Sequence, residues 1–237
     1  HNLALQVWLE LGAIGAALWV ANYKLLPESL HPAQRQPLNL RHLFRGYAEL
    51  GSNPQFLMLA VAAGVPFNGM FLYVVSAPVF LGQHLGLPPQ HYFVFFLMII
   101  AGIMAGAYLS GRLAGRMPPK RQVHLGFAVM GAVSLLNLAL NVVVDANAWW
   151  AMWPIGLYSF GWALMVPVVT LMVLDRAPTR RGMASSLQAC IGSVASGVVA
   201  GVMAPWVMES TVALAVGAVG LMAVGWVAWR WVALRPG

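Results

Sequence analysis

The chain has 237 residues, of which 60% are hydrophobic and only 8% are charged. Soluble domains carry roughly 25% charged residues, so this composition excludes an ordinary soluble globular domain. We interpret the net charge of +7 as the basic bias of membrane-protein loops and not as a nucleic-acid-binding surface.

Hydrophobic runs long enough to cross a membrane follow one another along the chain. A membrane-spanning helix needs about 20 mostly apolar residues, and this criterion predicts seven spans. They cover residues 3–23, 55–81, 92–113, 123–144, 149–174, 183–207 and 211–231. The sequence therefore predicts an all-α polytopic membrane protein.

All 13 Lys and Arg residues fall at one set of alternating gaps between these runs. They lie within 24–45, 112–121, 176–181 and 230–235, whereas the gaps at 84–91, 145–148 and 205–210 contain none. Short loops rich in Lys and Arg stay in the cytoplasm. We therefore expect a multi-pass protein of the inner (plasma) membrane with a cytoplasmic C-terminus. Because the chain opens inside an apolar run, with His1 on the outer side, we also expect a truncated N-terminus with further spans upstream.

The longest connection between spans, at 25–54, divides the chain into three parts. Residues 1–24 are expected to be the last helix of an N-terminal half, 25–54 a cytoplasmic central loop, and 55–237 a six-helix domain. Within the loop, apolar residues recur at helical spacing. They are Leu40, Leu43, Phe44, Tyr47 and Leu50. This pattern predicts a short amphipathic helix on the inner membrane surface, with a polar linker as the alternative.

A weak internal repeat relates the second and fifth spans. Pro66 and Pro78 in the second span have nearly the same separation as Pro154 and Pro167 in the fifth. The two helices begin successive three-span units, which must have opposite orientations in the membrane. Interrupted helices at matching positions of inverted repeats point to the binding cavity of a transporter. In the third span, Gly102 and Gly106 form a GxxxG motif, which predicts close contact with a neighbouring helix.

The loop between the third and fourth spans carries the most specific motif, the sequence GRLAGRMPPKR from Gly111 to Arg121. It resembles the cytoplasmic loop signature of the major facilitator superfamily, in which arginines bond to helix ends and nearby carboxylates. The resemblance implies a gate that holds one face of the bundle closed. Its residues are Gly111, Arg112, Gly115, Arg116, Lys120 and Arg121. Gly115 stands where the family usually has an acid, so this loop lacks a carboxylate that a full relay of charges would use. Asp175 and Arg176 flank the inner end of the fifth span and are expected to help close that face, with an ion pair at the membrane interface as the alternative.

Two further segments are similar to one group within that superfamily. LPES at 26–29 resembles the sequence that ends the sixth helix of drug-efflux members, and APTRRGMASS at 177–186 resembles the loop before the eleventh helix of Bcr/CflA-type drug:proton antiporters. The resemblance places the chain as the sixth to twelfth helices of a twelve-helix transporter. It implies a small-molecule substrate, protons and the lipid bilayer as partners, together with an N-terminal half that carries the main proton-coupling carboxylate.

Polar and aromatic residues of the second, fifth and sixth spans are the candidates for contact with substrate. They are Asn68, Tyr73, Ser76, Tyr158, Trp162 and Gln188. Such a lining suits apolar or cationic compounds, because aromatic faces attract cations. The alternative interpretation is that these residues bond neighbouring helices or pack between them.

Glu10 is the one acid placed inside a predicted span. Intramembrane carboxylates are candidates for proton carriers, and a structural bond or exposure near the outer edge is the alternative for Glu10. The spans contain no paired acids, Ser–His arrangement or metal-ligand spacing, so we expect no enzyme, catalytic residue, cofactor or metal site. The functional hypotheses are therefore proton-coupled export of amphiphilic or cationic compounds, transport of another metabolite, and a non-transporting membrane sensor or subunit.

Overall fold

The computed structural model describes residues 40–148 and 150–235, together with 15, 17, 19–21, 23 and 24. The chain separates into two units, His1–Leu43 and Phe44–Gly237. In the first unit, the described residues of the predicted span at 3–23 are helical. Glu10 lies outside the described residues.

Every regular element among the described residues is a helix, and five helices are long and apolar enough to cross a membrane. They are α5 (Tyr92–Leu113), α6 (Pro119–Val143), α7 (Trp153–Asp175), α10 (Thr211–Ala233) and the span formed by α8 (Arg181–Val198), η4 (Val199–Met203) and α9 (Ala204–Val207). The five predicted spans at 92–113, 123–144, 149–174, 183–207 and 211–231 are confirmed to within a few residues at each end. Prolines stand in the first turns of α6 and α7, where a missing N–H costs no intrahelical hydrogen bond.

The second predicted span is broken near its middle. Helices α3 (Pro54–Gly64) and α4 (Phe67–Val75) meet at an angle of 42°, and as one span they raise the number of candidate crossings to six. The bend lies at Pro66, which has no N–H to donate to the preceding turn. After α4 the chain continues through the π-helix η2 (Pro78–His84) and the short η3 (Pro89–His91) to α5.

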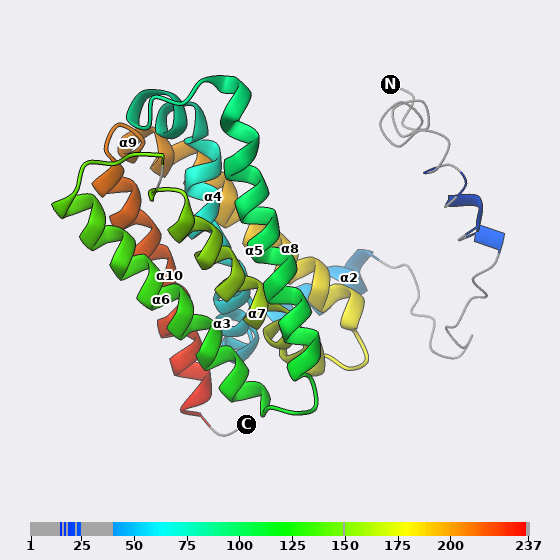
Figure 1. The fold of residues 1–237 in the computed structure, drawn as a ribbon. Coiled ribbons are helices and arrows are strands. Elements are labelled where there is room, and N and C mark those ends of the chain that lie inside the picture. Colours follow the sequence, from blue (N-terminus) through cyan, green and yellow to red (C-terminus); the bar gives the residue numbers. More distant parts are fainter. Residues whose placement is uncertain are drawn as a thin grey trace. The chain divides into compact units, whose positions relative to one another are not determined.

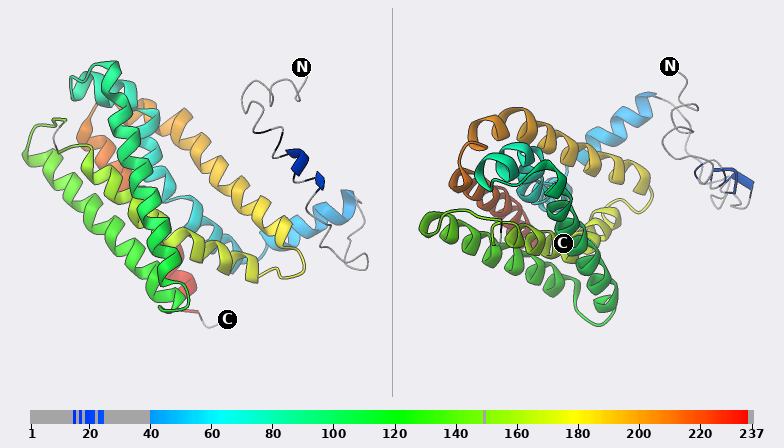
Figure 2. Two further views of the ribbon diagram at one scale, coloured as in Figure 1. Left: turned by 45° about the vertical axis from the view of Figure 1, so that its right-hand side comes forward. Right: turned by 45° about the horizontal axis from the view of Figure 1, so that its top comes forward.

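The helices of the second unit pack in an order that repeats between its two halves (Figures 1 and 2). The first repeat consists of α3 with α4, α5 and α6, and the second of α7, α8 and α10. The third helix of each repeat packs on the first helix of the other: α6 packs on α7, and α10 packs on α3 and α4. The second helix of each repeat also packs on the first helix of the other: α5 packs on α7, and α8 packs on α3. The two third helices, α6 and α10, contact each other. This exchange of equivalent partners matches the expected pair of inverted three-helix repeats.

Glycines bring α5 and α7 into close contact. A Cβ atom at Gly102 would collide with the carbonyl oxygen of Gly156, and one at Gly106 would collide with the carbonyl oxygen of Phe160. The GxxxG motif therefore does what its spacing predicts, because the missing side chains let the two backbones touch.

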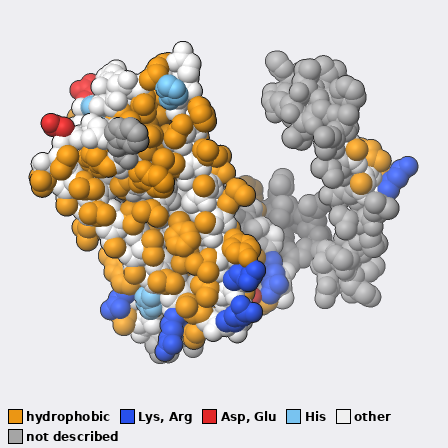
Figure 3. Space-filling view, in the orientation of Figure 1, with side chains coloured by type: hydrophobic (Ala, Val, Ile, Leu, Met, Phe, Trp, Pro, Cys, Tyr) orange, Lys and Arg blue, Asp and Glu red, His pale blue; other side chains and the backbone are white. Residues whose placement is uncertain are grey.

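The surface of the bundle has an apolar belt and a basic end. Large hydrophobic side chains are exposed along its sides, among them Leu97 at 58% and Val227 at 65%. Lys and Arg side chains gather at the lower end of the bundle in Figure 3. An exposed apolar surface of this extent fits a surrounding of lipid, since soluble monomers rarely expose such large patches.

Candidate functional site

An open groove of about 650 Å³ runs between α3, α4, α7 and α8. Helices α3 and α4 contribute Ala63, Gly64, Phe67 and Phe71 to its lining, and α7 contributes Trp162, Val166 and Thr170. Helix α8 contributes Ser185, Gln188, Ala189, Gly192, Ser193 and Ser196. None of these lining residues is charged, and the volume falls in the range of about 300–1,000 Å³ of small-molecule sites.

One wall of the groove is aromatic. The rings of Phe67 and Phe71 stack with centroids 5.7 Å apart, and Phe67 contacts the ring of Trp162 at 5.1 Å. The indole Nε1 of Trp162 donates a hydrogen bond of 3.2 Å to the carbonyl oxygen of Ala63. That bond fixes the orientation of the indole, so the three rings form a pre-arranged apolar surface.

The opposite wall, on α8, is made of small and polar side chains. The Nε2 atom of Gln188 donates a hydrogen bond of 3.0 Å to Oγ1 of Thr170 on α7. This bond links α8 to α7 within the groove lining. Ser185, Ser193 and Ser196 add hydroxyl groups to this wall. The groove thus pairs an aromatic face with a neutral hydrogen-bonding face.

Of the residues expected from the sequence to touch substrate, Trp162 and Gln188 line the groove, and the other four are buried elsewhere. Tyr158 donates a hydrogen bond of 2.7 Å to the Pro66 carbonyl oxygen. Tyr73 accepts one of 2.8 Å from Nδ2 of Asn137. Asn68 donates to the Gly64 carbonyl oxygen at 3.2 Å.

Ser76, the fourth, is 1% exposed. Tyr158 and Tyr73 bond to neighbouring helices and Asn68 bonds within its own span, since buried polar groups in an apolar bundle need partners inside the protein. Oγ of Ser76 has no hydrogen-bond partner among the described residues.

The sequence reasoning missed Phe67 and Phe71. Their four-residue spacing with Ala63 places the three residues on one side of α3 and α4, but the spacing alone does not tell that this side lines the groove.

The loop that carries the family signature has an unusual backbone conformation at Gly115, with φ of +75°. Nη1 of Arg116 bonds to the Arg112 carbonyl oxygen at 3.4 Å, and the Arg112 guanidinium lies 5.0 Å from the ring centroid of Tyr108. None of the three ion pairs found among the described residues includes a cation of this loop, Lys120 and Arg121 among them.

At the C-terminal end of α7, adjacent charges have different partners. Asp175 pairs with Arg181 at 3.2 Å, whereas Arg176 donates a hydrogen bond to Oε1 of Gln55. The Arg176 bond ties the end of α7 to the start of α3. A gating role for these residues and for Gly111 stays a prediction.

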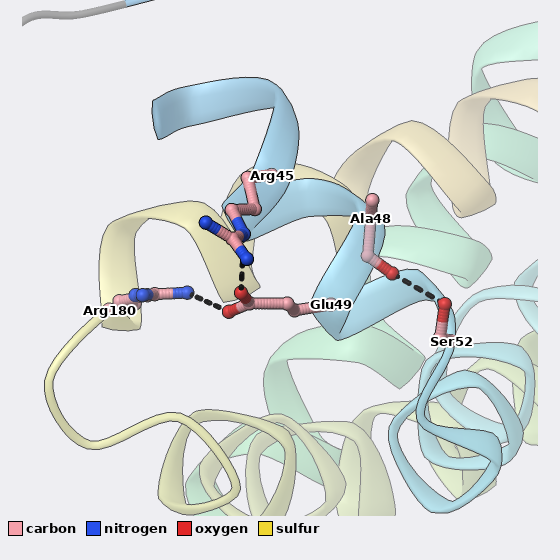
Figure 4. A network of polar contacts seen from close by, with 5 residues as sticks. All are labelled: Arg45, Ala48, Glu49, Ser52 and Arg180. Atoms are coloured by element: carbon pink, nitrogen blue, oxygen red, sulfur yellow. Dashed lines mark hydrogen bonds and ion pairs between the residues drawn. The ribbon is translucent and has the colours of Figure 1, made fainter. Parts of the chain in front are cut away.

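The helix predicted in the central connection is confirmed as α2 (Leu40–Gly51). Glu49 on α2 accepts a hydrogen bond of 2.6 Å from Nη1 of Arg180 and lies 3.7 Å from Arg45 (Figure 4). The hydroxyl groups of Tyr47 and Ser186 are 2.9 Å apart. These contacts connect α2 to the α7–α8 loop and the start of α8.

Among the described residues, no group of three His, Cys, Asp or Glu side chains could hold a metal ion. Glu10, the candidate proton carrier, lies outside the described residues, so its role stays a prediction.

Comparisons with known proteins agree with the motif and the fold. The family model "Major Facilitator Superfamily" matches residues 7–201. A bicyclomycin resistance protein homolog of Haemophilus influenzae is 27% identical over 212 residues, which cover 85% of this chain and 50% of that protein. The multidrug transporter MdfA of Edwardsiella piscicida is 24% identical over 187 residues, covering 78% of this chain and 45% of that protein.

The MdfA of Edwardsiella tarda matches with the same identity and coverage. This chain spans about half the length of these relatives. Their names agree with the resemblance to Bcr/CflA-type transporters. The match of the family model over most of the residues, together with the helical bundle and its membrane-spanning lengths, shows that the chain belongs to the major facilitator superfamily.

Proposed function

We propose that the chain provides the C-terminal half of a secondary active transporter that exports small amphiphilic or cationic compounds. The groove with its aromatic wall of Phe67, Phe71 and Trp162 is the observation that carries this proposal. Aromatic faces attract cations, by roughly 0.5–2 kcal/mol per contact, and they also accept flat apolar groups. The neutral polar wall on α8 would orient the bound compound through hydrogen bonds.

The second half of the substrate pathway is proposed to be an N-terminal half that covers the groove. Among the five candidate spans other than the bent α3–α4 pair, the span formed by α8, η4 and α9 has the smallest share of buried residues, and α7 has the largest. Ser185, Ala189 and Ser193, which line the groove on α8, are exposed. A partner half packed against this side would enclose substrate between the two halves near the midplane, as alternating access requires.

Proton antiport is the proposed energy source. It is supported by the resemblance to drug:proton antiporters and by relatives named for drug resistance and multidrug transport. The proposed orientation places the basic end of the bundle and the C-terminus in the cytoplasm, in accord with the distribution of Lys and Arg. Export then moves compounds from the basic side to the opposite side of the inner membrane.

The test is efflux of a fluorescent lipophilic cation from cells that express the complete reading frame. Replacing Trp162 by Ala removes a groove aromatic, and the expected result is a two- to thirtyfold weaker apparent affinity, roughly the value of one cation–π contact. The matched control is Trp206→Ala, because Trp206 is 85% exposed and does not line the groove. Equal efflux by both variants, or no efflux by the wild type, would refute the proposal.

A further inference from the structure

A second cavity, of about 360 Å³, lies at the basic end of the bundle among α3, α6, α7 and α10. It is separate from the substrate groove, with which it shares no lining residue. Its polar lining consists of Lys120, Asp175, Arg176 and Arg235, together with the indole of Trp229. The lining of the cavity therefore comes from four helices that are far apart in the sequence.

The charges that line this cavity are not balanced. Asp175 pairs at 3.2 Å with Arg181, which is not part of the lining. The cations Lys120, Arg176 and Arg235 take part in none of the three ion pairs among the described residues. Arg176 donates a hydrogen bond to the neutral Gln55, and Arg235 stacks on the ring of Trp231 at 3.9 Å. Three positive charges thus surround one space in which the single carboxylate, Asp175, is paired with a cation outside the lining.

Trp229 closes the inner side of the cavity and packs against His124, with ring centroids 5.6 Å apart. Its side chain lines the cavity and is 1% exposed. A ligand with several anionic oxygen atoms suits three cations that face one cavity, and phosphate has this chemistry.

The rest of the lining is apolar, from Leu59, Met172, Val232 and Ala233. A ligand that fits both parts has a phosphate and a hydrocarbon portion. Basic pockets between helices on the cytoplasmic side of membrane proteins bind anionic lipid head groups, and the distribution of Lys and Arg places this end on that side. We propose that the cavity binds the phosphate of an anionic phospholipid of the cytoplasmic leaflet, with the lipid glycerol and upper acyl chain against the apolar lining.

The first experiment uses the complete protein in detergent and native mass spectrometry. Phosphatidylglycerol and phosphatidylcholine with identical acyl chains are titrated separately, and inorganic phosphate is titrated alone and as a competitor. The expected result is a saturable site that prefers phosphatidylglycerol by about tenfold, since each basic residue near an anionic lipid contributes roughly 1 kcal/mol. Equal binding of the two lipids would overturn the proposal. Full displacement of lipid by millimolar inorganic phosphate would assign the cavity to a soluble anion and overturn the lipid assignment.

The second experiment compares two triple variants of equal charge. One combines Lys120→Gln, Arg176→Gln and Arg235→Gln in the cavity, and the other combines Arg112→Gln, Arg116→Gln and Arg121→Gln outside it. The cavity variant should lose the preference for phosphatidylglycerol by about tenfold or more, and the control should keep it. Equal losses would show a diffuse surface attraction and overturn the site. If the cavity variant does not fold, the single variant Lys120→Gln should lower the preference by about fivefold, and an unchanged preference in that variant would contradict the proposal.

Discussion

The hydroxyl group of Tyr158 on α7 donates a hydrogen bond of 2.7 Å to the carbonyl oxygen of Pro66, the residue at the bend between α3 and α4. Gly69 lies against the phenol group of Tyr158, and a Cβ atom at Gly69 would collide with the phenol oxygen. Pro66, Gly69 and Tyr158 therefore stabilise the bend between α3 and α4. Since α3 and α4 carry one side of the aromatic wall, this contact sets the position of Phe67 relative to Trp162.

Replacing Tyr158 by Phe removes this bond while it keeps the ring. The protein should lose about 0.5–1.5 kcal/mol of stability, the usual net value of one hydrogen bond. Thermal unfolding of the complete protein in detergent measures the change. Tyr108→Phe is the control, because Tyr108 is 64% exposed and a phenyl ring still faces Arg112. Equal unfolding temperatures for the two variants would contradict a structural role for the Tyr158 hydroxyl.

The close contact between α5 and α7 predicts that the stability of the protein depends steeply on side-chain size at Gly106. Gly106→Ala places a methyl group against the Phe160 carbonyl oxygen, and such overpacking costs typically 1–3 kcal/mol. Gly111→Ala on the same helix meets nothing within 4 Å, so it should be neutral or slightly stabilising, in line with helix propensity. Thermal unfolding of the two variants side by side checks this. Similar stability of both would argue against the close packing of α5 on α7.

The ion pair between Glu49 and Arg180 should contribute little energy. Their side chains are 53% and 28% exposed, and exposed pairs contribute about 0.2–1 kcal/mol. A double-mutant cycle with Glu49→Gln and Arg180→Gln should give a coupling in this range that decreases as salt is added. The same cycle for Arg45 and Glu49 serves as comparison, since Arg45 is 81% exposed and 3.7 Å away. A coupling for Arg180 no larger than that for Arg45 would show that the pair does not hold α2 against the α7–α8 loop.

The aromatic wall predicts which phenylalanines matter for binding. Phe67 contacts both Phe71 and Trp162, so Phe67→Ala removes the middle ring of the wall. The affinity of the purified complete protein for a lipophilic cation should fall by about two- to thirtyfold. Phe93→Ala should leave it unchanged, because Phe93 lies on α5, is 61% exposed and does not line the groove. Fluorescence titration gives both values, and an equal loss in the two variants would contradict the assignment of the groove.

Helix positions were predictable because apolar length is a direct signal in a membrane protein. The predicted span at 92–113 coincides with α5, and Gly102 and Gly106 make the contact expected of them. The candidate site was less predictable. Polarity pointed to Asn68, Tyr73, Ser76 and Tyr158, yet these residues are buried between helices, where partners for polar groups must come from the protein itself. A substrate groove for amphiphilic compounds is lined by ordinary aromatic residues such as Phe67, and sequence alone does not separate them from lipid-facing ones such as Phe93.

Transport by purified protein tests the central claim most directly. The complete protein is reconstituted in liposomes, a pH gradient is imposed, and uptake of a labelled lipophilic cation is recorded for wild type and Trp162→Ala. The proposal predicts uptake that requires the gradient, stops when a protonophore collapses it, and has a weaker apparent affinity in the variant. Uptake that is independent of the gradient, or no uptake by a protein that is folded and correctly inserted, would contradict proton-coupled export.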